Sequence, residues 1–558
     1  MAVIVDHGPA LKVGATDERA FPYSDRSLRR LCLALVGIGM ALRLGFFLLD
    51  FPLWWDEAFL ATNFLRRGFV GLLRPLDYGQ VCPILFLWAE LAIVRLFGFS
   101  EWTVRLFPLL CALVSVPLFY FCASRILSDR ALLLSLAIFA VSIHPIRHAA
   151  DLKPYSADLL VALSLQALAI TWLRNPTRLY WVWILVGLAP FCLLLSHPAV
   201  FVVAGVGLAM VGEALIVQKK SVWLSLIAYG VIASLVYASF YVLYVRNQAS
   251  IASPGMKEMW VNSFAPMGSP FLFLRWLVVA HTGDMLAYPC GGENSASSLS
   301  LLAAMIGSFV FWRSGRRLAL ACLLTPLGLA IIASALKLYP YGGPAPHGSA
   351  ARIMQYAAPG LCLLIGSGFS EMVAWISIAR VRERLFRVAL CGLLVIGLSP
   401  IVAGIIRPYR AYQAHAAREF ARRFWPEIEN GCEVTCLRWD LDVEEWDSIQ
   451  LGVAVSLCNQ AIYSPSRRRG GPRWQKVSRD HPLRCILGIA PLQDSPRLAN
   501  WLAVMDQRYE RIDRRTILVT VSEAGRAISR ERYEIFDFVP KGPLNKHPTP
   551  EAQTPKGS

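Results

Sequence analysis

Two adjacent carboxylates, Asp56 and Glu57, follow the first long apolar run of the sequence and stand directly after Trp54 and Trp55. Ionised groups beside lipid are costly and are usually kept where a site needs them, whereas tryptophan favours the headgroup layer. A carboxylate at a membrane surface can accept the proton of an attacking hydroxyl, which typically contributes about 10²–10⁴-fold to a rate. The alternative interpretation is a solvated loop that begins with an aromatic anchor.

Further polar groups stand between later apolar runs or near their ends. They are Asp77 and Tyr78; then His144, Arg147, His148, Asp151, Lys153, Tyr155 and Asp158; then His197 in Ser-His-Pro; and finally Tyr341, His347 and Arg352. Gly342 and Gly343, next to Tyr341, permit the close backbone approach that a sugar or phosphate would use. An arginine and a lysine at the level of the headgroups can hold a phosphate and stabilise the charge that grows on it as a bond breaks. These residue types suit the transfer of a group from a phosphate carried on a lipid.

Each of these residues also has a structural interpretation. Arg352 would serve as an interfacial anchor, His197 as a hydrogen-bonded loop residue, and Asp151 with Lys153 as a surface ion pair. Asp158 is harder to explain in this way, because a carboxylate one turn inside a membrane helix needs a partner. Its candidate partners are Arg147, Lys153 and Arg352.

A metal site is a separate possibility. Asp56, Glu57, His144 and His148 together could hold a divalent ion, and the sequence leaves metal dependence open.

The composition is that of a polytopic membrane protein. Of 558 residues, 56% are hydrophobic and 17% are charged, and the mean hydropathy is +0.48. The net charge of +17 is spread over short loops between apolar runs, which indicates topology and contact with anionic lipid headgroups; we expect no nucleic-acid partner. Thirty mostly polar residues precede the first run, and no small-residue cleavage site follows it, so we expect that run to be a retained helix.

Eleven apolar runs are candidates to cross about 30 Å of hydrocarbon. They lie at about 31–49, 105–124, 131–147, 156–173, 179–196, 199–217, 222–245, 298–312, 318–337, 353–376 and 387–406. Arginine and lysine concentrate in alternate connections, so the positive-inside rule places the N-terminus in the cytoplasm. Counting 78–99 as a span would invert every later loop, so we expect a helix in or at the outer interface there, with Glu90 and Arg95 near its end.

The predicted organisation has four parts. A cytoplasmic segment spans 1–30, and an all-α transmembrane domain spans 31–406, with a first outer loop at 50–104 that carries interfacial helices. A small extracytoplasmic α+β domain spans 407–542, and a disordered tail spans 543–558. Within the α+β domain, a helical pattern covers 412–424, and alternating runs at 433–439 and 516–521 predict strands.

Eleven of the thirteen cysteines fall into two groups. Seven lie in the apolar runs and are expected to be packing residues: Cys32, Cys111, Cys122, Cys192, Cys322, Cys362 and Cys391. Cys432, Cys436, Cys458 and Cys485 lie in the outer domain, where oxidation is possible and three pairings are open. A zinc site there is a minor alternative, because no histidine or second close cysteine pair accompanies Cys432 and Cys436.

Three segments, taken in order, resemble the lipid-linked-sugar transferases of the GT-C superfamily. They are Trp55-Asp56-Glu57-Ala58, then Asp151 to Asp158, then Tyr339-Pro-Tyr-Gly-Gly with Arg352 and Tyr356 to Pro359. The likeness covers about residues 30–410 and is strongest to bacterial relatives of the protein O-mannosyltransferases and the aminoarabinose transferase. The large outer repeat domain of the mannosyltransferases is missing, and the C-terminal domain matches nothing in the family.

This resemblance implies an inverting transfer of a sugar from a polyprenyl phosphate to an acceptor outside the cytoplasm, in a bacterial inner membrane. Asp56 falls at the family's acidic residue, proposed as base, and Glu57 at its neighbour. Lys153, Tyr155 and Arg352 fall where family members contact the donor, with Tyr341, His347 and His197 expected to shape the cavity. The acceptor, whether glycan, lipid or protein, is left open.

Two competing hypotheses come from other classes. A transporter or lipid flippase would show polar residues at mid-membrane and internal symmetry, whereas here the polar residues gather at one face and no repeat is visible. An inactive scaffold of the same fold is the other hypothesis, and only loss of transfer on mutation would argue against it.

Overall fold

The computed structural model describes residues 25–251, 260–292, 294–342, 344–345, 348–427, 433–436, 446–464, 483–487, 499, 502–503, 505–507, 509–523 and 526–541. The chain forms two compact units. The first unit comprises Met1–Phe51 and Arg66–Pro408, and the second comprises Pro52–Leu65 and Tyr409–Ser558.

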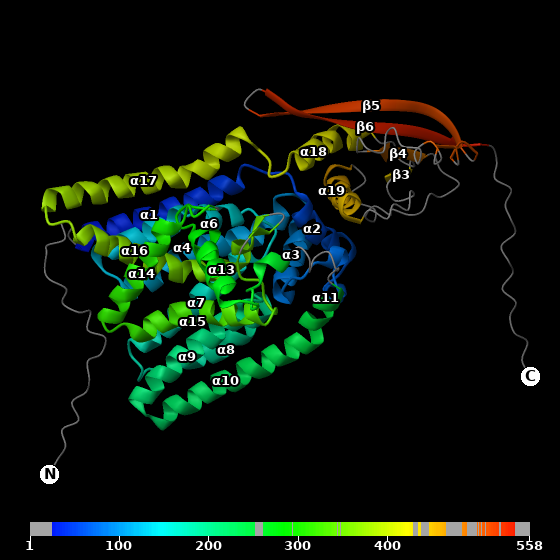
Figure 1. Ribbon diagram of the computed structural model, residues 1–558. Coiled ribbons are helices and arrows are strands. Elements are labelled where there is room, and N and C mark those ends of the chain that lie inside the picture. Colours follow the sequence, from blue (N-terminus) through cyan, green and yellow to red (C-terminus); the bar gives the residue numbers. More distant parts are fainter. Residues whose placement is uncertain are drawn as a thin grey trace, which may run out of the picture. The chain divides into compact units, whose positions relative to one another are not determined.

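The first unit is a bundle of apolar helices (Figure 1). Eight of its described helices are long and apolar enough to cross a membrane: α1 (Asp25–Phe47), α4 (Leu106–Ile126), α7 (Tyr155–Leu173), α9 (Ala199–Val217), α10 (Lys220–Phe240), α15 (Arg317–Ala335), α16 (Ala358–Ala374) and α17 (Ala379–Ile406). Two shorter apolar helices are α8 (Tyr180–Leu195) and α14 (Ser298–Arg313). The others are α3 (Ile84–Phe97), α5 (Asp129–Val141), α6 (Ile143–His148), α11 (Arg246–Ile251) and α13 (Pro270–Thr282). The predicted all-α polytopic fold is confirmed.

The predicted span at 131–147 is two helices, and a proline explains the break. α5 ends at Val141 and α6 begins at Ile143. Pro145 has no amide hydrogen, and within a continuous helix its ring would clash with the carbonyl four residues earlier, at Val141. The hydroxyl of Ser142 donates to the carbonyl of Ile138 at 2.6 Å, and the amide of Ile143 donates to the carbonyl of Pro289 at 3.0 Å. The chain therefore turns between the two helices, and α6 packs against α1, α4 and α17.

Glycines allow α16 to pack closely against its neighbours α14 and α5. A Cβ atom at Gly368 would lie 1.8 Å from the carbonyl oxygen of Ala303, and one at Gly307 would lie 1.9 Å from that of Leu364. A Cβ at Gly366 would meet the backbone of Ser135 at 2.5 Å. Small residues at such positions let membrane helices approach until their backbones are in contact.

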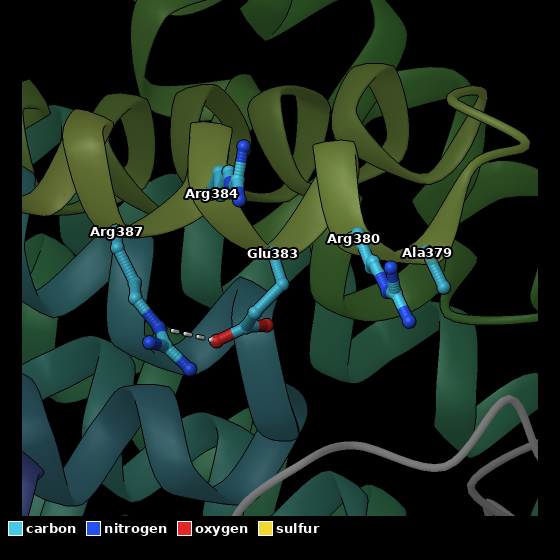
Figure 2. Close-up of a pocket in the computed structure, with 5 residues that line it drawn as sticks. All are labelled: Ala379, Arg380, Glu383, Arg384 and Arg387. Atoms are coloured by element: carbon cyan, nitrogen blue, oxygen red, sulfur yellow. Dashed lines mark hydrogen bonds and ion pairs between the residues drawn. The ribbon is translucent and has the colours of Figure 1, made fainter.

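The arginine-rich connections meet at one end of the first unit, which we call the arginine end. Arg316 donates to the carbonyl of Ile126 at 2.7 Å, so the start of α15 lies beside the end of α4. Arg130, at the start of α5, approaches Glu383 of α17 at 4.0 Å. Figure 2 shows the start of α17, where Arg380, Glu383 and Arg387 point to the same side of the helix. This gathering agrees with the predicted alternation of basic loops.

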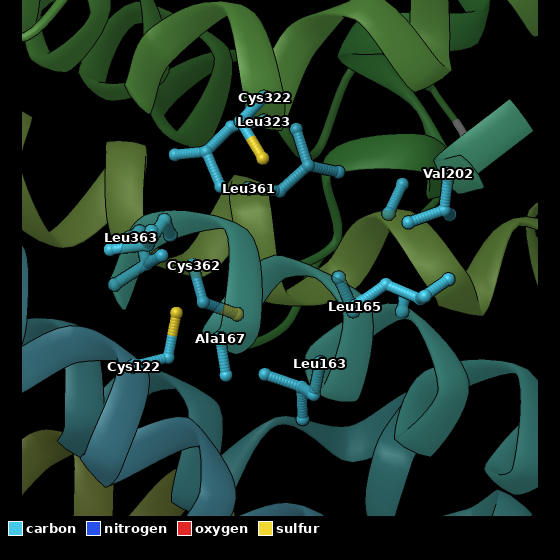
Figure 3. Close-up of a cluster of buried hydrophobic side chains, with 14 of the residues drawn as sticks. Cys122, Leu163, Leu165, Ala167, Val202, Cys322, Leu323, Leu361, Cys362 and Leu363 are labelled. Carbon is cyan, nitrogen blue, oxygen red and sulfur yellow. The ribbon is translucent and has the colours of Figure 1, made fainter. Parts of the chain in front are cut away.

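The interior of the bundle is apolar and carries most of the predicted packing cysteines. Cys122, Cys322 and Cys362 lie among leucines in the main core (Figure 3). Of the seven cysteines predicted to pack inside spans, six are buried, and Cys391 is exposed.

The second unit is α+β. Its sheet has the order β3 (Glu433–Cys436), β4 (Leu483–Leu487), β6 (Arg526–Pro540) and β5 (Tyr509–Glu523), and only the β3–β4 pair is parallel. The helices are α2 (Trp55–Arg66), α18 (Tyr412–Phe424) and α19 (Trp446–Tyr463). Phe420 of α18 stacks on Tyr533 of β6 with ring centroids 4.2 Å apart, which anchors the helix on the β5–β6 hairpin.

The predicted helix at 412–424 has the bounds of α18, and the runs at 433–439 and 516–521 contain β3 and part of β5. Cys458 is buried; Cys432 and the side chains of Cys436 and Cys485 lie outside the described residues, as does the tail after Gly542.

Candidate functional site

Lys153 lies at the opposite end of the first unit from the arginine end, just before α7. Its ammonium donates to Oε1 of Gln80 at 2.8 Å, and both side chains are 8% exposed. Tyr155, the first residue of α7, is also buried. This hydrogen bond fixes where the buried ammonium lies, and an ammonium in a fixed position can form a charge-assisted hydrogen bond with an anion.

The segment that carries Gln80 is fixed to the end of α10. The amide of Cys82 donates to Oε1 of Gln248 at 3.1 Å, and the hydroxyl of Tyr244 donates to the carbonyl of Cys82 at 2.9 Å. Nε2 of Gln248 in turn donates to the Tyr244 hydroxyl at 2.6 Å. A π-helical turn, Tyr241–Val245, includes Tyr244, and such turns are frequent at functional sites.

Asp158 lies one turn inside α7 and is 3% exposed, beside the side chain of Ser196. Tyr339 approaches the same region from the loop before the 3-10 helix Ala350–Ala357, and its hydroxyl donates to the carbonyl of Ile353 at 2.9 Å. Burial raises the pKa of Tyr339 well above its usual value, and the nearby Asp158 and Tyr155 add to the shift. The predicted segment Asp151 to Asp158 and the predicted loop that begins at Tyr339 are therefore brought together here.

The histidines of α6 form a structural network. Nδ1 of His148 lies 3.0 Å from Oδ2 of Asp151, and the His148 ring packs edge-on against Tyr155 with centroids 4.8 Å apart. Burial lowers the pKa of His144 to about 3, and the charges of His148 and Arg147 act in the same direction. His144 is therefore neutral at physiological pH.

His197 follows α8 and is stacked near Phe240, with ring centroids 6.0 Å apart. Burial lowers its pKa to about 4, which outweighs the opposite effect of the Cys82 backbone. Its Nε2 atom has no hydrogen-bond partner among the residues that the structure describes. A neutral imidazole in this place can donate to or accept from a bound hydroxyl.

Tyr341 is fully buried, and its hydroxyl lies 2.9 Å from Nε2 of His281 on α13. Gly342 was expected to allow close approach of a ligand, but the structure gives it a packing role. A Cβ atom there would lie 2.9 Å from that of Ala280. Tyr341 and Gly342 thus hold the loop against α13. His347, a predicted donor residue, lies outside the described residues.

Arg352 stands in the 3-10 helix Ala350–Ala357, which packs against α7. Its guanidinium carbon lies 5.5 Å from the ring centroid of Trp260. A cation–π contact of this kind restricts where the guanidinium lies, and a planar guanidinium matches the geometry of a phosphate.

Asp77 has a structural role in the first unit. It forms an ion pair with Arg67, which also donates to the carbonyl of Pro75 at 2.6 Å. Tyr78 adopts a left-handed backbone with a φ of 59°, so the turn between Asp77 and Gln80 is a tight one. We infer that this ion pair fixes the turn that presents Gln80.

Asp56 and Glu57 belong to the second unit, in the first turn of α2. Asp56 is 8% exposed and Glu57 is fully buried. The amide of Trp54 donates to Oε2 of Glu57 at 3.4 Å. Carboxylates in the first turn of a helix are stabilised by its unpaired amides and its dipole.

The predicted metal ligands are divided between the units: Asp56 and Glu57 belong to the second, and His144 and His148 belong to the first. Among the described residues, no three His, Cys, Asp or Glu side chains are grouped so that they could hold a metal ion. The rings of His144 and His148 have centroids 6.3 Å apart, and Asp151 already engages His148. We therefore assign no step to a metal.

Several residues of this region carried no local signal in the sequence. Gln80, Gln248 and His281 are ordinary polar residues whose partners are distant along the chain. Glu90 was expected near an interface, yet it is fully buried in α3, whereas Arg95 on the same helix is exposed. Burial raises the pKa of Glu90 well above its usual value.

Comparisons with solved structures show the fold. ArnT from Cupriavidus metallidurans bound to undecaprenyl phosphate matches with a TM-score of 0.52 and 12% identity, over 92% of this chain and 98% of that one. The apo state of the same protein matches with a TM-score of 0.48 and 13% identity, over 90% of this chain and 98% of that one. A third match is AglB, an archaeal oligosaccharyltransferase from Archaeoglobus fulgidus, in complex with an inhibitory peptide and a dolichol-phosphate. Its TM-score is 0.45 with 10% identity, over 93% of this chain and 75% of that one.

No protein-family model matches the chain, and no curated protein matches its sequence. The match to ArnT bound to undecaprenyl phosphate shows that the two chains share a fold.

Proposed function

We propose that this multi-pass membrane protein transfers a sugar from a polyprenyl-phosphate donor to an acceptor on the extracytoplasmic side, with inversion at the sugar. The observation that carries the proposal is the buried ammonium of Lys153 beside Tyr155 and the Tyr339 loop, within a fold shared with a protein solved with undecaprenyl phosphate bound.

Lys153 and Arg352 would hold the phosphate of the donor. As the bond between the anomeric carbon and the phosphate oxygen breaks, the electron pair stays on the leaving polyprenyl phosphate. Positive charge placed where this negative charge grows lowers the barrier. Tyr155, Tyr341 and His197 would shape the cavity around the sugar, and a neutral His197 suits contact with sugar hydroxyls.

Asp56 would act as the base. The acceptor hydroxyl attacks the anomeric carbon from the face opposite the phosphate, and its proton passes to the Asp56 carboxylate, so a single displacement inverts the sugar. This assignment comes from the sequence resemblance. Its structural support is the burial of Asp56 in the first turn of α2.

The test is transfer of a radiolabelled sugar from synthetic polyprenyl-phosphate donors to a membrane extract, with the purified chain in detergent. Wild type is expected to transfer label, and Asp56→Asn, which keeps the shape and removes the base, is expected to be slower by about 10²–10⁴-fold. Asp129→Asn, an exposed aspartate at the arginine end, is the matched control and should be unchanged.

The outcomes separate the parts of the proposal. No transfer by wild type from any polyprenyl-phosphate sugar, with lipid binding intact, would favour a scaffold of the same fold. Normal transfer by Asp56→Asn would contradict only the assignment of Asp56 as the base. A requirement for an added divalent ion would show that the activity depends on a metal, a question that the sequence left open.

A further inference from the structure

A shallow depression of about 340 Å³ opens at the start of α17, at the arginine end of the first unit. It is lined by Ala379, Arg380, Glu383, Arg384 and Arg387 (Figure 2). Three guanidinium groups and one carboxylate leave it two positive charges, which is the charge that suits a phosphate group.

Glu383 organises the arginines of this depression. Its carboxylate accepts a hydrogen bond from Nε of Arg387 at 3.0 Å, and the guanidinium of Arg130 on α5 approaches it at 4.0 Å. Arg380 and Arg384, by contrast, form no ion pair or side-chain hydrogen bond among the residues that the structure describes, and both are exposed. Two guanidinium forks therefore face the solvent beside a carboxylate that is already compensated.

The surroundings of the depression are apolar and exposed. Trp375 and Ile378 just before α17 are 63% and 64% exposed. Further along α17, an exposed apolar strip continues with Val388 at 66%, Val395 at 69% and Leu398 at 52%. In a helix that crosses a membrane, such a strip faces acyl chains, and tryptophan marks the headgroup layer.

The depression is remote from the candidate donor site. α16 runs its 17 residues from the 3-10 helix that carries Arg352 toward the start of α17. At about 1.5 Å per residue, this separates the two ends by roughly 25 Å. A ligand of the depression is therefore a different molecule from the sugar donor.

We propose that the depression at the start of α17 binds the phosphate of an anionic phospholipid, whose acyl chains lie along the exposed apolar strip of α17. Arg380 and Arg384 bind the phosphate oxygens, Glu383 and Arg387 hold the shape of the site, and the strip recognises the lipid tails. This site does not depend on the proposed transferase activity.

The test uses the full-length protein in detergent, titrated with dioleoyl phosphatidylglycerol and with dioleoyl phosphatidylcholine, with bound lipid counted by native mass spectrometry. Arg380→Gln with Arg384→Gln removes the two exposed charges. Arg174→Gln with Arg178→Gln is the matched control, because it removes two exposed arginines from another loop. Both pairs lie on the surface, so both variants are expected to fold.

Wild type and the control are expected to prefer phosphatidylglycerol, and the pocket variant is expected to bind it about tenfold more weakly. Binding of phosphatidylcholine should be the same in all three. Equal losses of phosphatidylglycerol binding in both variants would show a general charge effect and overturn the proposal. Unchanged phosphatidylglycerol binding in both variants would also overturn it. Displacement of the phosphatidylglycerol by millimolar inorganic phosphate would also overturn it, because the site would then recognise phosphate without the lipid.

Discussion

The ammonium of Lys153 and the side-chain carbonyl of Gln80 are 2.8 Å apart, although 73 positions separate the two residues in the sequence. The hydrogen bonds among Cys82, Tyr244 and Gln248 hold the segment that follows Gln80. A lysine side chain has four rotatable bonds, so a fixed acceptor limits where its charge can lie. Gln80 is therefore a positioning residue for Lys153.

Two variants of Gln80 test this role. Gln80→Leu removes the acceptor, and we expect the KM for the donor to rise about fivefold while kcat changes less. Gln80→Glu places a carboxylate beside Lys153 and neutralises its charge, so a larger rise in KM is expected. Steady-state kinetics with varied donor concentration would measure both. A wild-type KM in Gln80→Glu would show that the charge of Lys153 plays no part in donor binding.

Glu90 predicts how stability depends on pH. The unfolded carboxyl has a pKa near 4.3, whereas burial raises the pKa of Glu90 in the folded protein well above that value. Between these two values the folded state keeps a proton that the unfolded state has released, so stability falls as pH rises through this window. Glu90→Gln carries no such proton. We expect it to match wild type at pH 4 and to be more stable at pH 8.

Thermal unfolding in detergent across that pH range would measure the difference, with Glu371→Gln, a partly exposed glutamate on α16, as the control. The control should keep the pH dependence of wild type. Parallel curves for Glu90→Gln and wild type would show that Glu90 is ionised in the folded protein.

The close contact between α14 and α16 predicts an effect of a single methyl group. In Gly368→Ala the new Cβ would lie 1.8 Å from the carbonyl oxygen of Ala303, so the helices must separate. We expect a loss of about 1–3 kcal/mol or more in the free energy of unfolding. Gly37→Ala in α1, where nothing lies within 4 Å, should be neutral or slightly stabilising. The two variants would be compared by thermal unfolding, and equal stability would contradict the packing.

Much of the fold follows from local sequence patterns. Apolar runs predict where helices lie, because every backbone group in a membrane must find a partner within its own segment. The amphipathic pattern of 412–424 predicts α18 to the residue. Pro145 is a sequence signal for the break after Val141. The prediction of a single span at 131–147 followed the apolar composition of the segment instead.

The site was predictable only in part. The sequence predicts a site at Lys153, Tyr155 and Asp158, because polar residues are rare at the start of an apolar run. The partners Gln80 and His281 could not be predicted, because pairing across 73 and 60 positions depends on how helices pack. The burial of Glu90 could not be predicted for the same reason: α3 packs against α4 and α8, and Glu90 is fully buried.

The most direct test of the account is the binding of undecaprenyl phosphate, compared with undecaprenol, to the purified chain and to Lys153→Gln. Wild type should bind the phosphate about 10–100-fold more tightly than the alcohol, and Lys153→Gln should lose most of that preference. Lys219→Gln, an exposed lysine before α10, should keep it. Equal binding of phosphate and alcohol by wild type, or an undiminished preference in Lys153→Gln, would contradict the account.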